Sequence, residues 1–243
     1  RAVVSTWGDP ARQRPGAAYV FAQQPDGFWK LEATLTDTLA PGGPWPGGAV
    51  ALDGDVVALA APSYRYDRSS AVLLFVRQPD GSWRRDTTLS GIRDFNPALA
   101  LTGGELLVGE RLGGRHSGGR VRHYRRRDGR WTLVATLDPP QPYPNGGFGA
   151  VLAFDGRRAL VSGFDEQLGL DFNVDQVVYV FVHTADRWCF WRRIDPGEKA
   201  FGAALSLHGD LALIGVPREG GPGAAYLIPL DAARCELKEP LGK

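Results

Sequence analysis

The sequence has no methionine, only two cysteines, and no apolar run close to the ~18 residues that a membrane-spanning helix needs. Two cysteines cannot form a disulfide framework, although one bridge between Cys189 and Cys235 stays open. Because the chain starts at Arg1 rather than at a methionine, we expect a processed chain or a fragment whose signal peptide, if any, has been removed. A formal net charge of +1 gives no electrostatic preference for nucleic acid, which is not an expected partner.

Glycine and proline are abundant, with 32 and 18 residues, and hydrophobic residues make up 43% of the chain. This density of helix breakers excludes a helical bundle, and the apolar content excludes a disordered chain. Many short elements separated by turns are typical of an all-β fold. Composition therefore predicts an all-β protein, in one large domain or two small ones.

One pattern recurs at a spacing of about 50 residues, which is typical of propeller blades rather than of helical solenoids. Each copy has a small or aromatic residue, a glycine, an apolar strand, a tight turn and a second apolar strand. The first strands cover residues 47–52, 95–99, 148–152 and 201–205. The turn glycines that follow them are Gly54, Gly103, Gly156 and Gly209.

A third strand and a tryptophan extend the repeated unit. The third strands are rich in small, β-branched and aromatic residues and cover residues 16–21, 71–75, 177–181 and 223–227. A glycine-containing turn then leads to a fourth strand, which begins near Trp29, Trp83, Trp131 or Trp188. We interpret these tryptophans as apolar plugs between layers.

The repeated unit combines Phe-Gly, a Gly-Asp turn, a Gly-Ala-Pro-like strand end and a Gly-Ala-Val-Tyr-Val-Phe-like strand followed by tryptophan. This combination resembles the FG-GAP repeat of integrin alpha-chain propellers and related bacterial surface proteins. The resemblance implies a single five-bladed β-propeller of four-stranded antiparallel blades over residues 1–243. It also implies a secreted protein, with an extracellular, periplasmic or cell-surface location. The blades are expected at residues 1–46, 47–94, 95–147, 148–200 and 201–243.

Blade 1 is expected to lack its innermost strand, because residues 2–7 align with the second strand of the other units. An exposed inner edge would be open to pairing with another strand. A segment or chain that completes blade 1 is therefore an expected partner.

The order of the strands predicts two unlike faces. The turns between strands 1 and 2 and between strands 3 and 4 are short, and the other connections are long and dissimilar. Recognition usually concentrates on loops held by a rigid scaffold, so we expect a protein or a carbohydrate to bind the long-loop face. Its aromatic candidates are Trp7, Trp45, Tyr64, Tyr66, Tyr143 and Phe172.

The integrin propellers that this chain resembles carry calcium in their 1–2 loops. Here those loops have two residues and cannot surround an ion with six or more oxygens. The remaining acidic loop contains Asp165, Asp171 and Asp175, which could hold Ca²⁺ or could be a solvated loop. No other cofactor is expected.

The third unit replaces apolar residues of the repeat by charged ones. One interpretation is an internal ion pair between Glu110 and Arg122, because buried charge needs a partner. The other is a polar pocket for an anionic or sugar ligand. Its candidate residues are Glu110, Arg111, Arg115, His116, Arg122 and His123.

A non-catalytic binding module is the function that the sequence favours. The alternatives are a lectin with small sugar sites on the loop aromatics and an enzyme with a polar pocket near Glu110, Arg111 and His123. No metalloprotease, nucleophile-elbow or phosphate-loop motif occurs, so no catalytic residue is assigned. The equivalent positions of Cys189 and Cys235 on adjacent outer strands argue against a bridge between them, without deciding the question.

Overall fold

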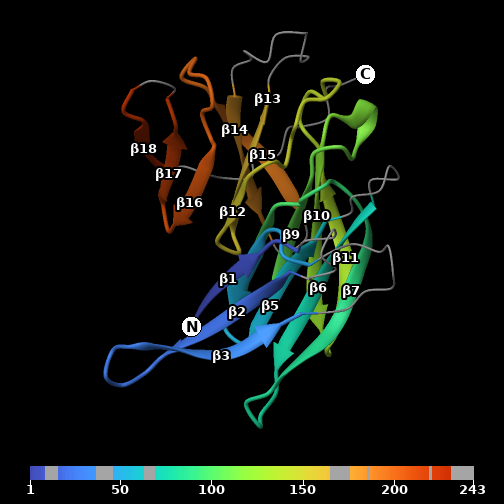
Figure 1. Ribbon diagram of the computed structural model, residues 1–243. Helices are drawn as coiled ribbons and strands as arrows, with labels where there is room; N and C mark the ends of the chain where they lie inside the picture. Colours follow the sequence, from blue (N-terminus) through green and yellow to red (C-terminus); the bar gives the residue numbers. More distant parts are fainter. Residues whose placement is uncertain are drawn as a thin grey trace.

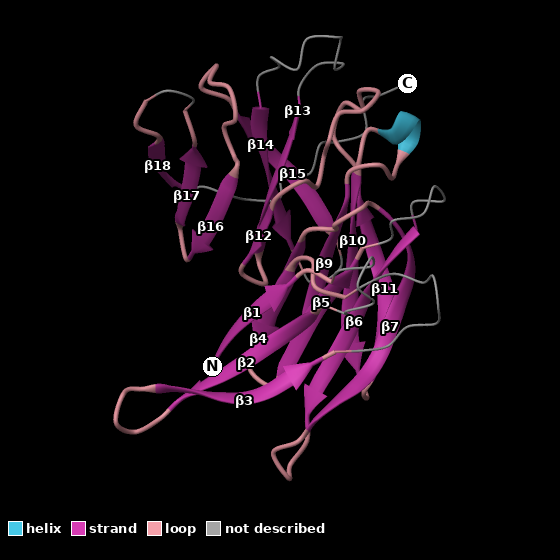
Figure 2. Ribbon diagram, viewed as in Figure 1, coloured by secondary structure: helices cyan, strands magenta, loops and turns pink. Residues whose placement is uncertain are grey.

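The computed structural model describes residues 1–8, 16–36, 46–62, 69–164, 176–184, 187–218 and 221–230. These residues form five antiparallel sheets arranged in a ring as a five-bladed β-propeller (Figure 1). Apart from one short 3-10 helix, η2 (Arg115–Ser117), the regular structure of these described ranges is entirely β (Figure 2). The predicted fold class is confirmed.

Each blade is an up-and-down meander whose strands follow chain order. Blade 1 contains β1 (Ala2–Thr6), β2 (Ala17–Gln23) and β3 (Trp29–Leu35). Blade 2 contains β4 (Val50–Asp53), β5 (Val56–Ala61), β6 (Ser69–Arg77) and β7 (Trp83–Arg93). Blade 3 contains β8 (Leu99–Thr102), β9 (Glu105–Glu110), β10 (Arg120–Arg127) and β11 (Arg130–Leu137).

Blade 4 repeats the same order with β12 (Leu152–Phe154), β13 (Arg158–Phe164), β14 (Gln176–His183) and β15 (Trp188–Ile194). The described part of blade 5 contains β16 (Ala204–His208), β17 (Leu211–Val216) and β18 (Ala224–Pro229). The expected fourth strand of blade 5, at residues 235–238, lies outside the described residues. No helix in the described part of the chain is long and apolar enough to cross a membrane.

The strand register shows that blade 1 lacks its innermost strand, as expected. Ala2 of β1 is paired with Phe21, and Val57 of β5 is paired with Phe75. Phe21 and Phe75 hold the same repeat position, directly after the register shift in each third strand. Therefore β1 corresponds to the second strand β5, and no strand described in blade 1 corresponds to β4.

Adjacent blades pack face to face through alternating side chains, because successive residues of a strand point to opposite faces of the sheet. In blade 2, Leu59 and Leu73 pack against Val20 of blade 1. On the other face, Ala58 and Leu74 join a cluster with blade 3. Both faces of an inner blade are therefore buried, which explains why its strands contain long apolar runs.

The Phe-Gly pairs have a clear structural role in blades 4 and 5. Phe148 and Phe201 are fully buried, and the glycine after each has a left-handed backbone, with φ of +93° at Gly149 and +91° at Gly202. Blade 3 differs, since its Phe95 is 45% exposed. The repeat thus uses phenylalanine as a core anchor in some blades only.

The two ends of the propeller differ as the strand order predicted. At one end, here called the turn end, glycines such as Gly54 and Gly156 close the short hairpins with positive φ. The other end is here called the loop end. It carries the longer connections, which run between the second and third strands of a blade and between successive blades. Several of these connections lie partly or wholly outside the described residues.

The prediction that the two cysteines are unpaired is wrong. Cys189 is disulfide-bonded, and the only other cysteine of the chain is Cys235, which lies outside the described residues. The prediction rested on the distance between equivalent outer strands of adjacent blades. A disulfide holds its two Cα atoms within about 7 Å of each other, so the expected wide separation of the two cysteines was mistaken.

We predict that Gly149→Ala destabilises the protein more than Gly129→Ala, by at least about 1 kcal/mol. Both glycines have positive φ, so both changes carry the left-handed penalty of about 1–2 kcal/mol. A Cβ at position 149 would also lie 2.9 Å from the Arg120 carbonyl oxygen, whereas nothing lies within 4 Å of one at position 129. Equal losses in urea unfolding would contradict this packing role.

Candidate functional site

Several residues that the sequence marks as ligand candidates lie outside the described residues. They are Trp45, Tyr64, Tyr66 and Phe172, together with the possible calcium ligands Asp165, Asp171 and Asp175. Of the remaining aromatic candidates, Trp7 follows β1 at the loop end and is 58% exposed. Tyr143 is partly buried, and its hydroxyl donates a hydrogen bond to Gln141 Oε1 over 3.0 Å.

Glu110, at the end of β9, is fully buried and is held by two arginines of β10. Its Oε2 lies 2.5 Å from Arg120 Nε, and its Oε1 lies 2.9 Å from Arg122 Nε. Arg122 also donates to the Gly91 carbonyl of blade 2 over 3.2 Å. The expected Glu110–Arg122 ion pair is therefore present, and it joins blade 3 to blade 2.

A second buried acid, Asp94, neutralises Arg111. The Arg111 guanidinium donates to both Asp94 oxygens, over 3.1 and 3.0 Å, and the Arg111 backbone N–H donates over 2.7 Å. The hydrogen bonds that its guanidinium donates to Asp94 raise the pKa of Arg111, outweighing the effect of burial. Asp94 also accepts from the Asn96 backbone N–H over 3.0 Å, so it fixes the connection between β7 and β8.

Two candidates of the third blade remain exposed at the loop end. Arg115 and His116 are in η2, where His116 has a left-handed backbone with φ of 53°. The His116 carbonyl accepts from the Asn145 N–H over 3.4 Å, and Gly119 forms a bridge with Phe148. These contacts attach η2 to the connection that leads into blade 4.

His123 does not share a pocket with Glu110 and Arg122. Adjacent residues of β10 point to opposite faces, so Arg122 faces blade 2 and His123 faces blade 4. There Trp188 Nε1 donates to His123 Nδ1 over 3.1 Å. The structure thus divides the candidate set of blade 3 between two interfaces and the loop end.

The surroundings of His123 include residues that the sequence did not single out. Glu105 lies between two histidines, with its Oε1 3.7 Å from His123 Nε2 and its Oε2 3.6 Å from His183 Nδ1. Arg125 Nε pairs with the same Glu105 carboxylate over 2.6 Å. The His183 ring stacks on the Trp188 ring at 4.4 Å.

His123 is neutral and has a defined tautomer. The indole N–H of Trp188 can only donate, so Nδ1 must accept and the proton must be on Nε2. Burial lowers the pKa of His123 to about 4; the charge of Glu105 raises it, while His183 and Arg125 lower it further. A histidine with so low a pKa is a weak general base near neutral pH.

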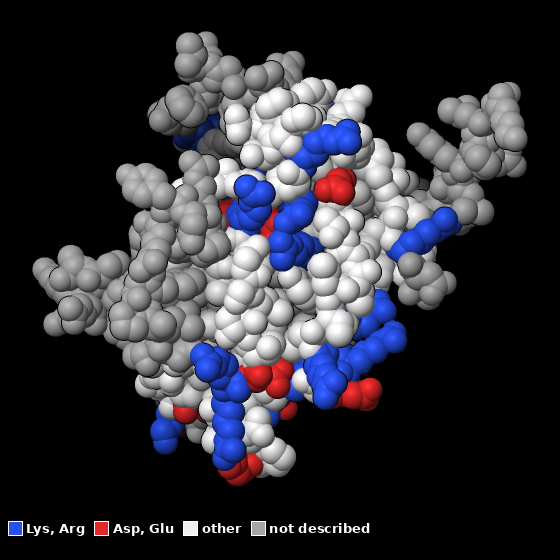
Figure 3. All heavy atoms as spheres, turned by 90° about the vertical axis from the view of Figure 1, so that its right-hand side faces the viewer, with Lys and Arg blue, Asp and Glu red and all other residues white. Residues whose placement is uncertain are grey.

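Most charges of the arginine-rich third blade are compensated. Figure 3 shows groups of basic side chains with acidic ones among them on the face toward the right of Figure 1. Arg126 and Asp86, for example, lie 3.4 Å apart. Within the described ranges, no three His, Cys, Asp or Glu side chains converge as a metal site.

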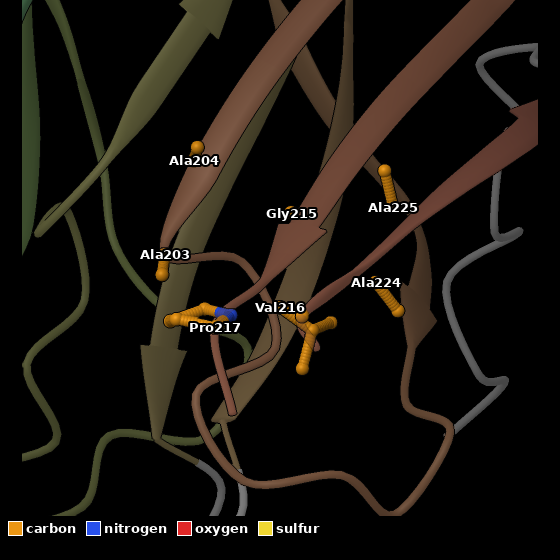
Figure 4. Close-up of a pocket in the computed structure, with 8 residues that line it drawn as sticks. Ala203, Ala204, Gly215, Val216, Pro217, Ala224 and Ala225 are labelled. Carbon is orange, nitrogen blue, oxygen red and sulfur yellow. The ribbon is translucent and has the colours of Figure 1, made fainter. Parts of the chain in front are cut away.

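A hollow lies at the loop end of blade 5, partly on the face that does not pack on blade 4. It has a volume of about 550 Å³. Figure 4 shows its small apolar side chains, which come from β16, β17, β18 and the adjoining loops. The lining residues are Ala203, Ala204, Gly215, Val216, Pro217, Gly223, Ala224 and Ala225.

The same face of blade 5 is apolar beyond the hollow. Leu211, Leu213 and Leu227 are 44%, 46% and 65% exposed. The sequence could have revealed this face, because it follows from the alternation of residues in β17 and β18. It was missed because the same alternation is used for blade packing elsewhere in the repeat.

Comparison with known proteins finds no matching family model and no curated protein of significant similarity.

We predict that Glu110→Gln lowers the free energy of unfolding by about 3–5 kcal/mol, because it leaves two arginines without their buried counter-charge. Asp80→Asn is the control, since the Asp80–Arg84 pair is exposed and spans 3.9 Å, so that its loss should cost much less stability. Urea unfolding at pH 7 measures both changes. A loss at Glu110 no larger than the loss at Asp80 would contradict the role assigned to this pair.

We predict that His123 makes the protein less stable as the pH falls from 6.5 to 4. In this window the unfolded chain takes up a proton at His123 and the folded chain does not, because the folded pKa is about 4 rather than 6.5. The shift corresponds to a loss on the order of 3 kcal/mol. His123→Leu should remove this part of the pH dependence in urea unfolding, whereas His208→Gln, in an exposed turn, should retain it. Equal pH dependence in wild type and His123→Leu would contradict the assignment.

Proposed function

We propose that this protein is a non-catalytic binding module that recognises a partner protein through the loop end of the propeller. The observation that carries the proposal is the apolar hollow of blade 5. It opens between the β17–β18 loop, represented by Pro217 and Gly223, and the connection before β16, represented by Ala203 (Figure 4). Such connections are where propellers of this strand order vary most.

The chemistry of the hollow favours a protein over a sugar. Its lining consists of alanine, glycine, valine and proline, which offer no side-chain hydrogen-bond donor or acceptor. A sugar site needs polar groups to pair with hydroxyls, often beside an aromatic ring. An aliphatic side chain of a partner needs only an apolar seat, which burial would stabilise by about 25 cal/mol per Å².

Other exposed groups at the loop end fit a protein interface. Trp7 presents a large ring, and Arg115 is a cation that makes no ion pair with a described residue. Tryptophan and arginine are enriched among the residues that dominate protein–protein binding energy. Among the described aromatic candidates, Trp7 is the one exposed ring that could support the lectin alternative.

The enzyme alternative has less support. Glu110, Arg111 and Arg122 are each paired with an opposite charge, and His123 lies at a different interface with a pKa of about 4. Groups committed to neutralising one another have no free capacity for acid–base chemistry on a substrate.

We also propose membership of an FG-GAP-like group of secreted or cell-surface proteins, of the kind found in bacteria. The buried Phe148 and Phe201, each followed by a glycine of positive φ, support the Phe-Gly assignment. The disulfide at Cys189 supports an oxidising compartment, because disulfides are rare in the cytosol.

We predict that Ala204→Trp, which fills the hollow, weakens binding of the partner at least tenfold. Ser206→Trp is the matched control, because Ser206 is also exposed on the same face of β16 but does not line the hollow. The partner is first identified by photo-crosslinking in the source organism, with the crosslinker placed at position 225. Affinities of the three proteins are then compared by biolayer interferometry.

A glycan array probed with the labelled protein tests the lectin alternative in parallel. Specific glycan binding that Trp7→Ala abolishes and Ala204→Trp retains would replace the protein-binding proposal. Equal partner binding by Ala204→Trp and Ser206→Trp would also contradict it.

A further inference from the structure

A repeated bulge aims one side chain of each outer strand at the next blade. In β3, β7, β11 and β15 the register shifts by one residue, leaving one residue without a partner opposite it. The bulge residues are Glu32, Asp86, Val134 and Trp191. Bulges of this kind redirect a side chain while the sheet continues.

In blades 1 and 2 the bulge residue is an acid that binds the next blade. Glu32 accepts from Trp83 Nε1 over 2.9 Å and from Arg77 Nε over 2.8 Å. Asp86 accepts from Trp131 Nε1 over 3.1 Å, and Arg126 Nε lies 3.4 Å away. Burial alone would raise the pKa of Glu32, but its hydrogen bonds from Arg1, Trp83 and Arg77 lower it to about 2.

Blade 3 breaks this rule, because its bulge residue is Val134. The repeat would place a carboxylate there, facing Trp188 of blade 4. Instead the Trp188 indole N–H donates to His123, which occupies a position held by Leu74 in blade 2. The interface between blades 3 and 4 therefore lacks the bulge carboxylate that the two preceding interfaces have.

A hollow of about 250 Å³ lies at this interface, at the turn end. Its lining is rich in nitrogen donors and contains no carboxylate. The lining residues are His123, Arg125, Arg127, Val134, Ala135, His183, Arg187 and Trp188. Unlike the hollow of blade 5, it is suited to a charged ligand.

The charge around this hollow is unbalanced. Arg125 is paired with Glu105, which also faces His123 and His183. Neither Arg127 nor Arg187 makes an ion pair with any residue that the structure describes. Among the side chains that are always charged near neutral pH, three arginines and one glutamate leave two positive charges.

A buried donor in the hollow also has no acceptor. His123 is fully buried, and its Nε2, which carries the proton, has no hydrogen-bond partner among the described residues. The nearest Glu105 oxygen is 3.7 Å away, beyond hydrogen-bond range. A buried donor without a partner is destabilising, so an acceptor placed there would be stabilised.

We propose that the hollow between blades 3 and 4 binds a tetrahedral oxyanion, a phosphate or sulfate group of a small ligand. The oxyanion replaces the missing bulge carboxylate, accepts from His123 Nε2, and is paired with Arg127 and Arg187. Two uncompensated positive charges match a dianion better than a single carboxylate, and arginine pairs with such oxygens through two donors. This site is at the opposite end from the proposed protein-binding surface and is independent of it.

We predict that inorganic phosphate and sulfate bind wild-type protein at pH 7 with one site, measured by calorimetry at constant ionic strength. Binding should also shift the His123 Nε2–H resonance in NMR spectra, which locates the anion. Arg127→Gln combined with Arg187→Gln should weaken binding at least tenfold. Arg130→Gln is the control, because Arg130 is exposed on the same hairpin but does not line the hollow.

A second variant tests whether the bound anion takes the place of the missing bulge carboxylate. Val134→Asp places an acid at the bulge, as in Asp86 of blade 2, and should abolish phosphate and sulfate binding while the thermal unfolding transition is retained. The proposal is overturned if neither anion binds wild type, if the double arginine variant binds as wild type does, or if Val134→Asp still binds. Acetate binding as tightly as phosphate would overturn the assignment to a tetrahedral dianion.

Discussion

Packing between adjacent blades is the constraint on which the structure depends. A blade of four short strands has little core of its own, so it is stable only when its faces are covered by neighbours. In blade 2, Leu59 and Leu73 serve one neighbour while Ala58 and Leu74 serve the other. The alternation of side chains along each strand therefore distributes the hydrophobic core over the spaces between sheets rather than within them.

The same constraint decides where charge is tolerated. Glu110 is fully buried at an interface, and it persists there because Arg120 and Arg122 compensate it within 3 Å. Toward the turn end the bulge acids Glu32 and Asp86 act in a similar way, each accepting from a tryptophan of the next blade. Where Val134 interrupts this series, charge and hydrogen bonding at the interface are left incomplete. A break in a repeat thus becomes a candidate binding site.

Blade 5 packs on a neighbouring blade through one face and leaves apolar side chains exposed on the other. Its β17 buries Ile214 against blade 4 but leaves Leu213 and Leu211 exposed on the other face. An apolar face of this kind would be costly in isolation, and a partner that covers it gains the free energy that blade packing provides elsewhere. The loop-end hollow lies on this face, so the proposed interface extends the packing principle of the propeller to a second molecule.

The all-β class, the number of blades and the missing inner strand could be predicted from the sequence, because a repeat of about 50 residues with alternating apolar positions has few structural solutions. The sequence also identified the Glu110–Arg122 pair, since both charges fall on positions that the repeat keeps apolar. Only the tertiary structure separated His123 from Glu110, brought Glu105 and His183 to it, and revealed the disulfide at Cys189. These contacts join residues of different strands or blades, and their geometry depends on bulges and sheet packing that no local pattern encodes.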